Sequence, residues 1–207
     1  MIALALAAAI AAYSAPVPVY RDTWISPAID FPQRGINSDS YTLMTTELTV
    51  NPHGGLIGCR AKIIAGNAGM GRYTCALLKT RALFEPARDP SGRRMYGIDR
   101  EVIGWALLQK LSPPVDIPGA AQFEVKVSRL PSGMKQPARS KIQFAVDVGG
   151  SISSCSPLRD DKEPALAQLA CGALGPAFHV EPALDNKGRP VPSVQNATVE
   201  LKATGAE

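Results

Sequence analysis

The chain has 207 residues, of which 45% are hydrophobic and 19% charged, and its formal net charge is +4. This composition is too apolar for a disordered tail, and the chain is too short for a large multidomain enzyme. The charge is too weak and too dispersed to indicate binding of nucleic acid. We therefore expect a small globular protein without a nucleic-acid partner.

Residues 1–14 (MIALALAAAIAAYS) carry no charge and are mostly apolar. The stretch is much shorter than the ~20 residues that cross a bilayer, so we expect no integral membrane span. It is typical of the apolar region of a secretory signal peptide, and the small residues Ala12 and Ser14 favour cleavage after Ser14. The alternative is an uncleaved hydrophobic tail that acts as an anchor. Export would place the chain in an oxidising compartment.

An internal repeat relates two parts of the chain. A shift of 96 residues aligns Cys59 with Cys155 and Cys75 with Cys171 without a gap. Across positions 48–105 the shift gives eleven identities, where chance would give about three or four. We infer a duplication with a first module at residues 21–108, a linker at 109–120 and a second module at 121–204.

The first module predicts two strands, a helix and a closing strand. Residues 44–50 alternate between two faces, which indicates a half-buried strand. A glycine-containing turn at residues 53–55 leads into a second strand, residues 56–65. Residues 71–83 have helical spacing, and residues 99–108 close the unit.

The second module repeats this order. Residues 142–148 alternate, Gly149 and Gly150 form the turn, and a second strand starts at Ile152. A helix is predicted over 162–174, with Asp161 as its cap and Pro164 in its first turn. A closing strand follows, and one extra strand precedes the module; they span residues 197–203 and 123–130. The fold class is therefore α+β, with two tandem two-layer modules, each a β-β-α-β unit with a small antiparallel sheet and one helix packed on it.

The four cysteines form two equally spaced pairs, each joining a predicted strand to the following helix. A helix that lies on a sheet brings such residues face to face, so we expect disulfides from Cys59 to Cys75 and from Cys155 to Cys171. Four thiolates could also hold zinc, although structural zinc favours closely spaced pairs. The other alternative is a set of buried free thiols.

Several segments of the first module together resemble a known family. They are DFP at residues 30–32, LTVNPHGGLIGCRA at 48–61, FEPA at 84–87 and REVIGW at 100–105. Residues 24–105 resemble the C-terminal domain of TonB, the energy transducer of the Gram-negative envelope, and the second module is a more diverged copy. The residues that carry the family motif are Phe31, Pro32, Phe84, Pro86 and Ala87.

The resemblance implies a periplasmic protein that binds a partner and needs no cofactor. In the family, a short extended segment of an outer-membrane receptor is added to a sheet edge, where main-chain hydrogen bonds supply affinity. We therefore expect an envelope protein partner for this chain, possible self-association as a homodimer, and a role related to TonB-dependent transport. The alternative is a structural scaffold of an envelope complex that transduces no energy.

The closing strand of the first module is the candidate edge, because no later strand of that module can cover it. Its charged residues would discourage self-pairing, and its glycine leaves a gap for another backbone. Alternatively, the strand pairs with residues 123–130 or with its own copy in a second molecule, and its tryptophan belongs to the core. The candidate residues are Arg100, Glu101, Val102, Ile103, Gly104 and Trp105.

No motif indicates an enzyme. His53 and His179 are the only histidines, and no Ser-Asp or Cys-His pattern accompanies them. Asp89 and Asp185 recur in the repeat, each before a glycine-containing turn, where side-chain capping of the turn is the expected role. We therefore expect neither catalytic residues nor a metal site.

Overall fold

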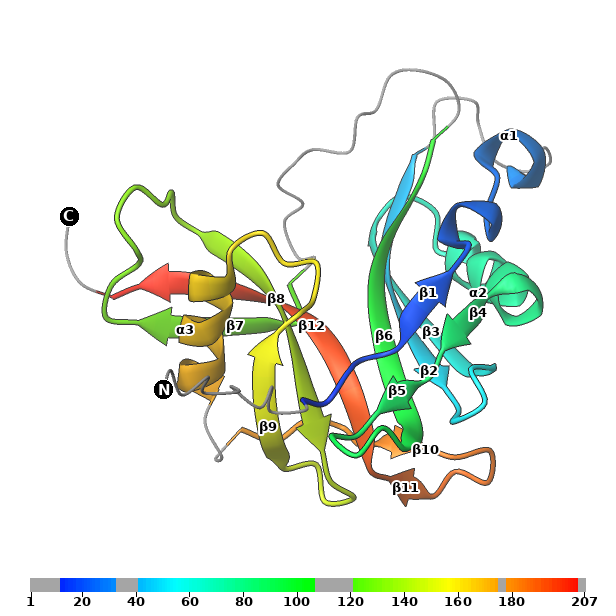
Figure 1. Ribbon diagram of the computed structural model, residues 1–207. Helices are drawn as coiled ribbons and strands as arrows, with labels where there is room; N and C mark the ends of the chain where they lie inside the picture. Colours follow the sequence, from blue (N-terminus) through cyan, green and yellow to red (C-terminus); the bar gives the residue numbers. More distant parts are fainter. Residues whose placement is uncertain (1–11, 33–40, 107–120, 175–177, 205–207) are drawn as a thin grey trace, which may run out of the picture.

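A computed structural model describes residues 12–32, 41–106, 121–174 and 178–204 (Figure 1). The predicted linker lies outside the described residues, and so do residues 1–11 of the predicted signal peptide. The first half of the chain contains β1 (Val17–Val19), η1 (Arg21–Thr23), α1 (Pro27–Asp30), β2 (Thr42–Val50), β3 (Leu56–Ala65), α2 (Gly69–Arg81), β4 (Leu83–Glu85), β5 (Ala87–Arg88) and β6 (Arg94–Trp105).

The second half has the same succession of longer elements, and the chain as a whole is mixed α+β, as expected. Its elements are β7 (Phe123–Val127), β8 (Ala138–Val146), β9 (Ile152–Pro157), α3 (Pro164–Leu174), β10 (Ala183–Leu184), β11 (Pro190–Val191) and β12 (Ser193–Ala203).

One mixed sheet of eight strands runs through both halves, in the order β3-β2-β6-β12-β8-β9, with β5 and β7 off this path. The sequence pattern predicts two small antiparallel sheets instead. The difference arises because β6 and β12, the closing strands of the two halves, pair with each other in parallel. Their pairing covers only three residues of each strand, Tyr96–Ile98 with Ser193–Gln195, and the strands then diverge.

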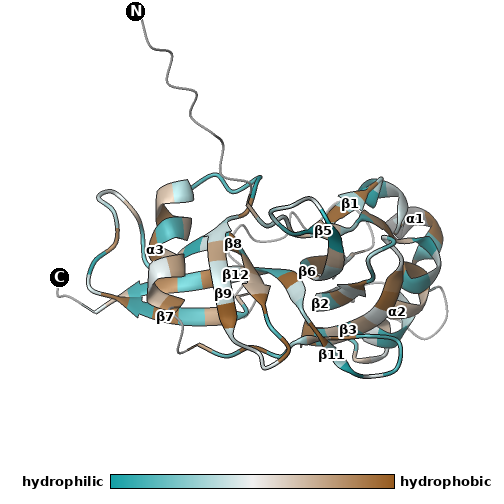
Figure 2. Cartoon of the chain, turned by 60° about the horizontal axis from the view of Figure 1, so that its bottom comes forward, coloured by the Kyte–Doolittle hydropathy of each residue, from teal (hydrophilic) through white to brown (hydrophobic). Residues whose placement is uncertain are grey.

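The two long helices lie on opposite faces of this sheet. Ile103 and Trp105 of β6 belong to the core beneath α2, whereas Val199 and Leu201 of β12 belong to the core beneath α3. All four of these residues are odd-numbered. In the β6–β12 pairing, however, the even-numbered Ile98 lies opposite the odd-numbered Gln195. Paired residues point to the same face of a sheet, so the two odd-numbered rows face in opposite directions. Figure 2 shows hydrophobic residues on the elements of both halves.

Both predicted disulfides are formed. Cys59 is bonded to Cys75 and Cys155 to Cys171, each across a sequence separation of 16. Each bond ties an outer strand of the sheet, β3 or β9, to the helix that covers it. β3 and β9 each pair with only one neighbouring strand, and the disulfide therefore gives each of them a second, covalent attachment.

The two predicted glycine turns are also present and are built alike. Gly54 and Gly150 have positive φ angles of 86° and 87°. The Gly54 carbonyl accepts a hydrogen bond from the N–H of Phe84, and the Gly150 carbonyl accepts one from Val180. A Cβ at either glycine would stand within 2.4 Å of the facing carbonyl oxygen. Both the positive φ angle and this close contact therefore require glycine at each position.

Some predicted boundaries and roles are wrong. Helix α3 begins at Pro164, and Asp161 does not cap it, because its carboxylate accepts hydrogen bonds from Ser140 Oγ and the Lys141 N–H of β8. The extra strand β7 ends at Val127 and pairs in parallel with β12. The closing strand of the first half starts at Arg94 and ends at Trp105, and residues 107 and 108 lie outside the described residues.

Candidate functional site

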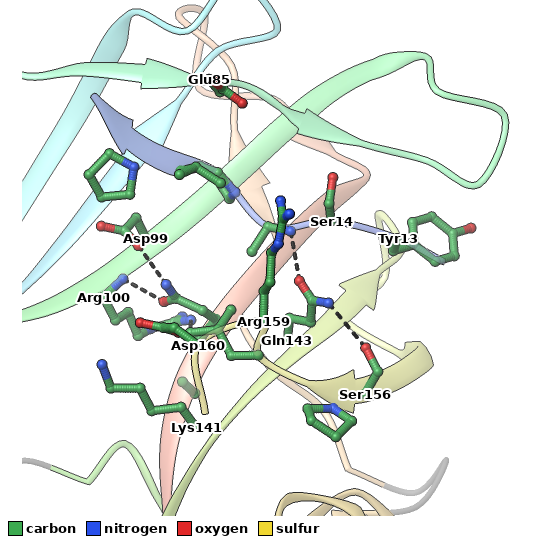
Figure 3. A pocket seen from close by; sticks show the side chains of 18 of the residues that line it. Tyr13, Ser14, Glu85, Asp99, Arg100, Lys141, Gln143, Ser156, Arg159 and Asp160 are labelled. Carbon is green, nitrogen blue, oxygen red and sulfur yellow. Dashed lines mark hydrogen bonds between the residues drawn. The ribbon is translucent and has the colours of Figure 1, made fainter. Parts of the chain in front are cut away.

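A cleft of about 790 Å³ opens where β6 and β12 diverge, on the face of the sheet that carries α2 (Figure 3). The diverging strands contribute Asp99 and Glu101 from β6 and Asn196 from β12. Strand β8 adds Lys141 and Gln143. The cleft therefore has both halves of the chain in its walls.

An N-terminal segment, residues 12–19, forms another wall of the cleft, and we call it the strap. Ser14 and Arg88 exchange two backbone hydrogen bonds of 3.0 Å each. The N–H of Ala15 donates to Gln143 Oε1 at 2.9 Å. Pro16 lies directly against Gly97 of β6, because a Cβ there would stand 2.2 Å from the Pro16 Cγ. The strap thus contacts the first half through Arg88 and Gly97 and the second half through Gln143.

Asp99 is the most unusual group of the cleft. The residue is only 1% exposed, and its Oδ1 accepts a hydrogen bond from Asn196 Nδ2. Its Oδ2 is buried without a hydrogen-bond partner. Burial, and then the nearby charge of Glu101, raise the pKa of the Asp99 carboxyl to about 7. The carboxyl therefore changes its charge near neutral pH, which an ordinary aspartate does not.

Glu101 points to the same face two residues further along β6. Its carboxylate forms an ion pair with Arg21 at 2.5 Å. Burial raises its pKa, whereas the charges of Arg21 and Lys141 act in the opposite direction. Asp99 and Glu101 lie on the same face of β6 as Ile103 and Trp105, which belong to the core. Two acidic residues in such a row are a sequence signal that could have indicated this cleft.

Arg100 lies on the opposite face and holds the two halves together. Its side chain is 8% exposed and bonds Glu47 Oε2, Gln195 Oε1 and the Asn196 carbonyl. Its backbone N–H donates to Asn196 Oδ1 at 2.6 Å. Burial lowers the pKa of Arg100, although Glu47 opposes the shift. The polar groups of Arg100, one of the predicted partner-binding residues, are thus already bonded at the β6–β12 junction.

The two sides of the candidate edge strand differ in how they are paired. β2 pairs with β6 along the whole of 97–105, so one side of the strand is covered. On the other side, β7 pairs with β12 instead of β6, and the described strands give Val102–Trp105 no second neighbour. Trp105 is 1% exposed and donates from Nε1 to Thr74 Oγ1 at 2.9 Å, so its side chain is part of the core.

The family-motif residues are mostly structural. Phe84 and Phe31 are buried and contact Trp24 and Trp105, with ring centroids 4.9 and 6.2 Å apart. Ala87 is fully buried. Pro32 is half-buried, and Pro86 lines the cleft beside the strap.

Asp89 and Asp185 cap their turns as predicted. Asp89 Oδ1 accepts from the N–H groups of Ser91 and Arg93, and Asp185 Oδ1 accepts from those of Lys187 and Arg189. The pKa of Asp89 is lowered to about 2, mainly by hydrogen bonds from Ser91. The pKa of Asp185 is also lowered to about 2, mainly by hydrogen bonds from Arg189.

The described residues contain no group of three or more His, Cys, Asp or Glu side chains that could hold a metal ion. Within the same ranges, no helix has the length and apolar character needed to cross a membrane. The cleft offers carboxylates, amides and cationic groups, which can hold polar and main-chain groups of a ligand. No family model, curated protein or solved structure matches the chain.

Proposed function

We propose that the chain is an exported envelope protein that binds an extended segment of a protein partner by strand addition to residues 102–105 of β6. The observation that carries the proposal is the short β6–β12 pairing. It ends at Ile98, and among the described strands the end of β6 keeps a neighbour only on the β2 side. A peptide that enters the gap between the diverging strands can continue the sheet.

The orientation of the backbone supports this edge. The N–H of Arg100 points away from β2, because it bonds Asn196 of β12. Successive N–H groups of a strand alternate in direction, so those of Val102 and Gly104 point to the same side. Gly104 is exposed and has no side chain to obstruct a second backbone. A peptide can therefore pair with the N–H and carbonyl groups of both Val102 and Gly104.

The two outermost strands of the sheet are less suitable. β9 has only six residues and ends at Pro157, and β3 carries Arg60 and Lys62. Short length, proline and charged side chains are the devices by which edge strands avoid pairing. The open end of β6, with Val102, Ile103 and Gly104, carries neither a proline nor a charged side chain.

Export is supported by the disulfides and by the apolar N-terminal stretch. Both cysteine pairs are bonded, and disulfides persist in oxidising compartments such as the periplasm. The resemblance to the TonB C-terminal domain names the partner class, a segment of an outer-membrane receptor, and a role related to TonB-dependent transport. Under this proposal two diverged copies of that domain share one sheet.

The test compares two substitutions at one position. Val102→Pro removes a ladder donor, whereas Val102→Thr keeps the N–H and the branched side chain. A photo-activated cross-linker at residue 104 first identifies the partner segment in intact cells. A synthetic peptide of that segment is then titrated against the purified variants.

We expect Val102→Pro to weaken binding by about tenfold or more, because a main-chain hydrogen bond and its close approach are lost. Val102→Thr should bind like the wild type. Both variants must keep both disulfides, measured as a mass about 4 Da below that of the reduced chain. Equal binding by a folded Val102→Pro variant refutes strand addition here. Cross-links only between two copies of the chain identify a homodimer instead.

A further inference from the structure

We propose that the partner segment lies parallel to β6, in the place that β7 occupies on β12, and that it presents an apolar side chain beside Ile103. The inference rests on strand addition at β6, the proposed function, and adds the direction, the register and the side-chain pattern of the bound segment. The observation that carries it is that β6 and β12 are equivalent strands, of which only β12 has a second parallel neighbour among the described strands.

The equivalence of the two strands follows from their registers. Val50 lies opposite Gly97 in the pairing of β2 with β6. Val146 lies opposite Ser193 in the pairing of β8 with β12. Both residues of the second pair come 96 positions after their counterparts, so β6 and β12 correspond residue by residue at that shift.

One side of β12 has two parallel neighbours in succession. β6 pairs with Ser193–Gln195, and β7 then pairs with Val199–Ala203, while β8 covers the other side along 193–201. The corresponding side of β6 has β12 opposite Tyr96–Ile98 but no described strand opposite 102–105. The open end of β6 is thus the counterpart of the stretch of β12 that β7 covers. Because β7 runs parallel to β12, a segment in the equivalent place runs parallel to β6.

The side chains at the equivalent positions differ in exposure. Val199 is fully buried, and Phe123 of β7 lies opposite it and packs against the same core cluster. Ile103, the counterpart of Val199, is only half-buried, although it belongs to the core beneath α2. An apolar side chain opposite Ile103 would remove its remaining surface from water.

The residue before Phe123 adds a polar requirement. The Gln122 N–H donates to the Thr198 carbonyl at 2.9 Å, and the Thr198 N–H donates to Gln122 Oε1 at 2.7 Å. Val102 corresponds to Thr198, and its N–H points to the open side of β6. A partner segment with an acceptor side chain directly before its apolar residue can satisfy both main-chain groups of Val102 in the same way.

The first half does not cover this edge with the segment that corresponds to β7. That segment, residues 27–31, forms helix α1 and Phe31 rather than a strand. Phe31 packs against Trp105 from the end of this helix, with the ring centroids 6.2 Å apart. The core is therefore completed by a side chain, and the described strands leave the main chain of Val102 and Gly104 for a partner.

The test uses the sequence of β7 itself as the probe, as a synthetic peptide of residues 121–127 (AQFEVKV) with one position changed to cysteine. The target is the full chain with both native disulfides and Gly104→Cys. The fold accommodates this change, because a Cβ at Gly104 meets only Leu43 Cδ1, at 3.8 Å. Disulfide exchange in a glutathione buffer traps the peptide thiol that lies beside residue 104, and intact mass measures the yield of the adduct.

The position of the peptide cysteine reports the direction. With Phe123 opposite Ile103, a parallel peptide places residue 124 beside residue 104, whereas an antiparallel peptide places residue 122 there. We expect an adduct with the Glu124→Cys peptide and none above background with the Gln122→Cys peptide. Replacing Phe123 by aspartate in the Glu124→Cys peptide should abolish the adduct, because the apolar contact is lost.

Adding Val102→Pro to the target should also abolish the adduct, with both native disulfides kept. An adduct that survives Val102→Pro, equal yields from the two cysteine peptides, a higher yield from Gln122→Cys, or no adduct with either peptide overturns the inference, and a yield unchanged by the aspartate overturns the apolar contact. If Val102→Pro weakens binding of the partner peptide but the β7 peptide fails in this way, strand addition stands and only this inference is refuted. If Val102→Pro leaves binding of the partner peptide unchanged, both are refuted.

Discussion

Replacing Asp99 by asparagine should stabilise the protein at alkaline pH and have little effect in acid. The pKa of this carboxyl is raised from its ordinary value near 3.8 to about 7. The folded state therefore keeps a proton that the unfolded chain releases, and stability falls as the pH rises from about 4 to about 7. At about 1.4 kcal/mol per pKa unit, the total loss is about 4 kcal/mol above the higher pKa.

Asparagine has nearly the same shape and carries no charge at any of these pH values. Its oxygen can accept the hydrogen bond from Asn196, while its amino group takes the place of Oδ2, which has no partner. We expect the free energy of unfolding of Asp99→Asn to exceed that of the wild type by about 2–4 kcal/mol at pH 8.5. At pH 4, where the wild-type carboxyl is protonated, the difference should be within about 1 kcal/mol.

Urea unfolding at the two pH values measures this difference directly. Asp22→Asn is the control, because it makes the same change of side chain at an exposed position. If Asp99→Asn and the wild type lose stability equally between pH 4 and pH 8.5, the carboxyl is not buried in its charged form and the reasoning is wrong. Part of the slope should remain in the variant, because burial raises the pKa of Glu101 as well.

Two further predictions concern the covalent and steric supports of the fold. Replacing Cys59 and Cys75 together by alanine should lower the free energy of unfolding by about 3 kcal/mol, and replacing Cys155 and Cys171 should have a similar effect, because both bonds close loops with a sequence separation of 16; peptide mapping that shows links between the halves would overturn this pairing. Gly97→Ala should cost about 1–3 kcal/mol in the same urea assay, because its Cβ would overlap Pro16 of the strap. The matched control Gly172→Ala, in helix α3 with no atom within 4 Å of the new Cβ, should instead stabilise by about 0.5–1 kcal/mol.

The features that the sequence predicts well are local ones. Alternation along 44–50 identifies a strand, since each residue's own position decides which face it joins. The repeat adds information that one copy lacks: Cys59 and Cys155 occupy equivalent strands, so a single helix-on-strand geometry explains both disulfides. The turn glycines and the aspartate caps were found in the same way, because their roles depend on residues within a few positions.

The junction between the halves could not be predicted in this way. The pairing of Tyr96–Ile98 with Ser193–Gln195 joins segments almost a hundred residues apart, and nothing in either pattern indicates a partner. The strap was missed for a related reason. Its sequence, AYSAPVPV, has no strand periodicity, and its position depends on the space above Gly97 and on Arg88 of a two-residue strand.

The junction also limits where the proposed strand addition can occur. In a single β-β-α-β unit the closing strand is an edge along its whole length. Here the first part of that strand is occupied by β12, and Arg100 and Asn196 fix the point at which the two strands separate. Strand addition on β6 is therefore restricted to the few residues beyond that point. A partner segment that enters there passes close to Asp99 and Glu101, so its affinity under the proposed mechanism should depend on the charge of these carboxyls as well as on the main chain of β6.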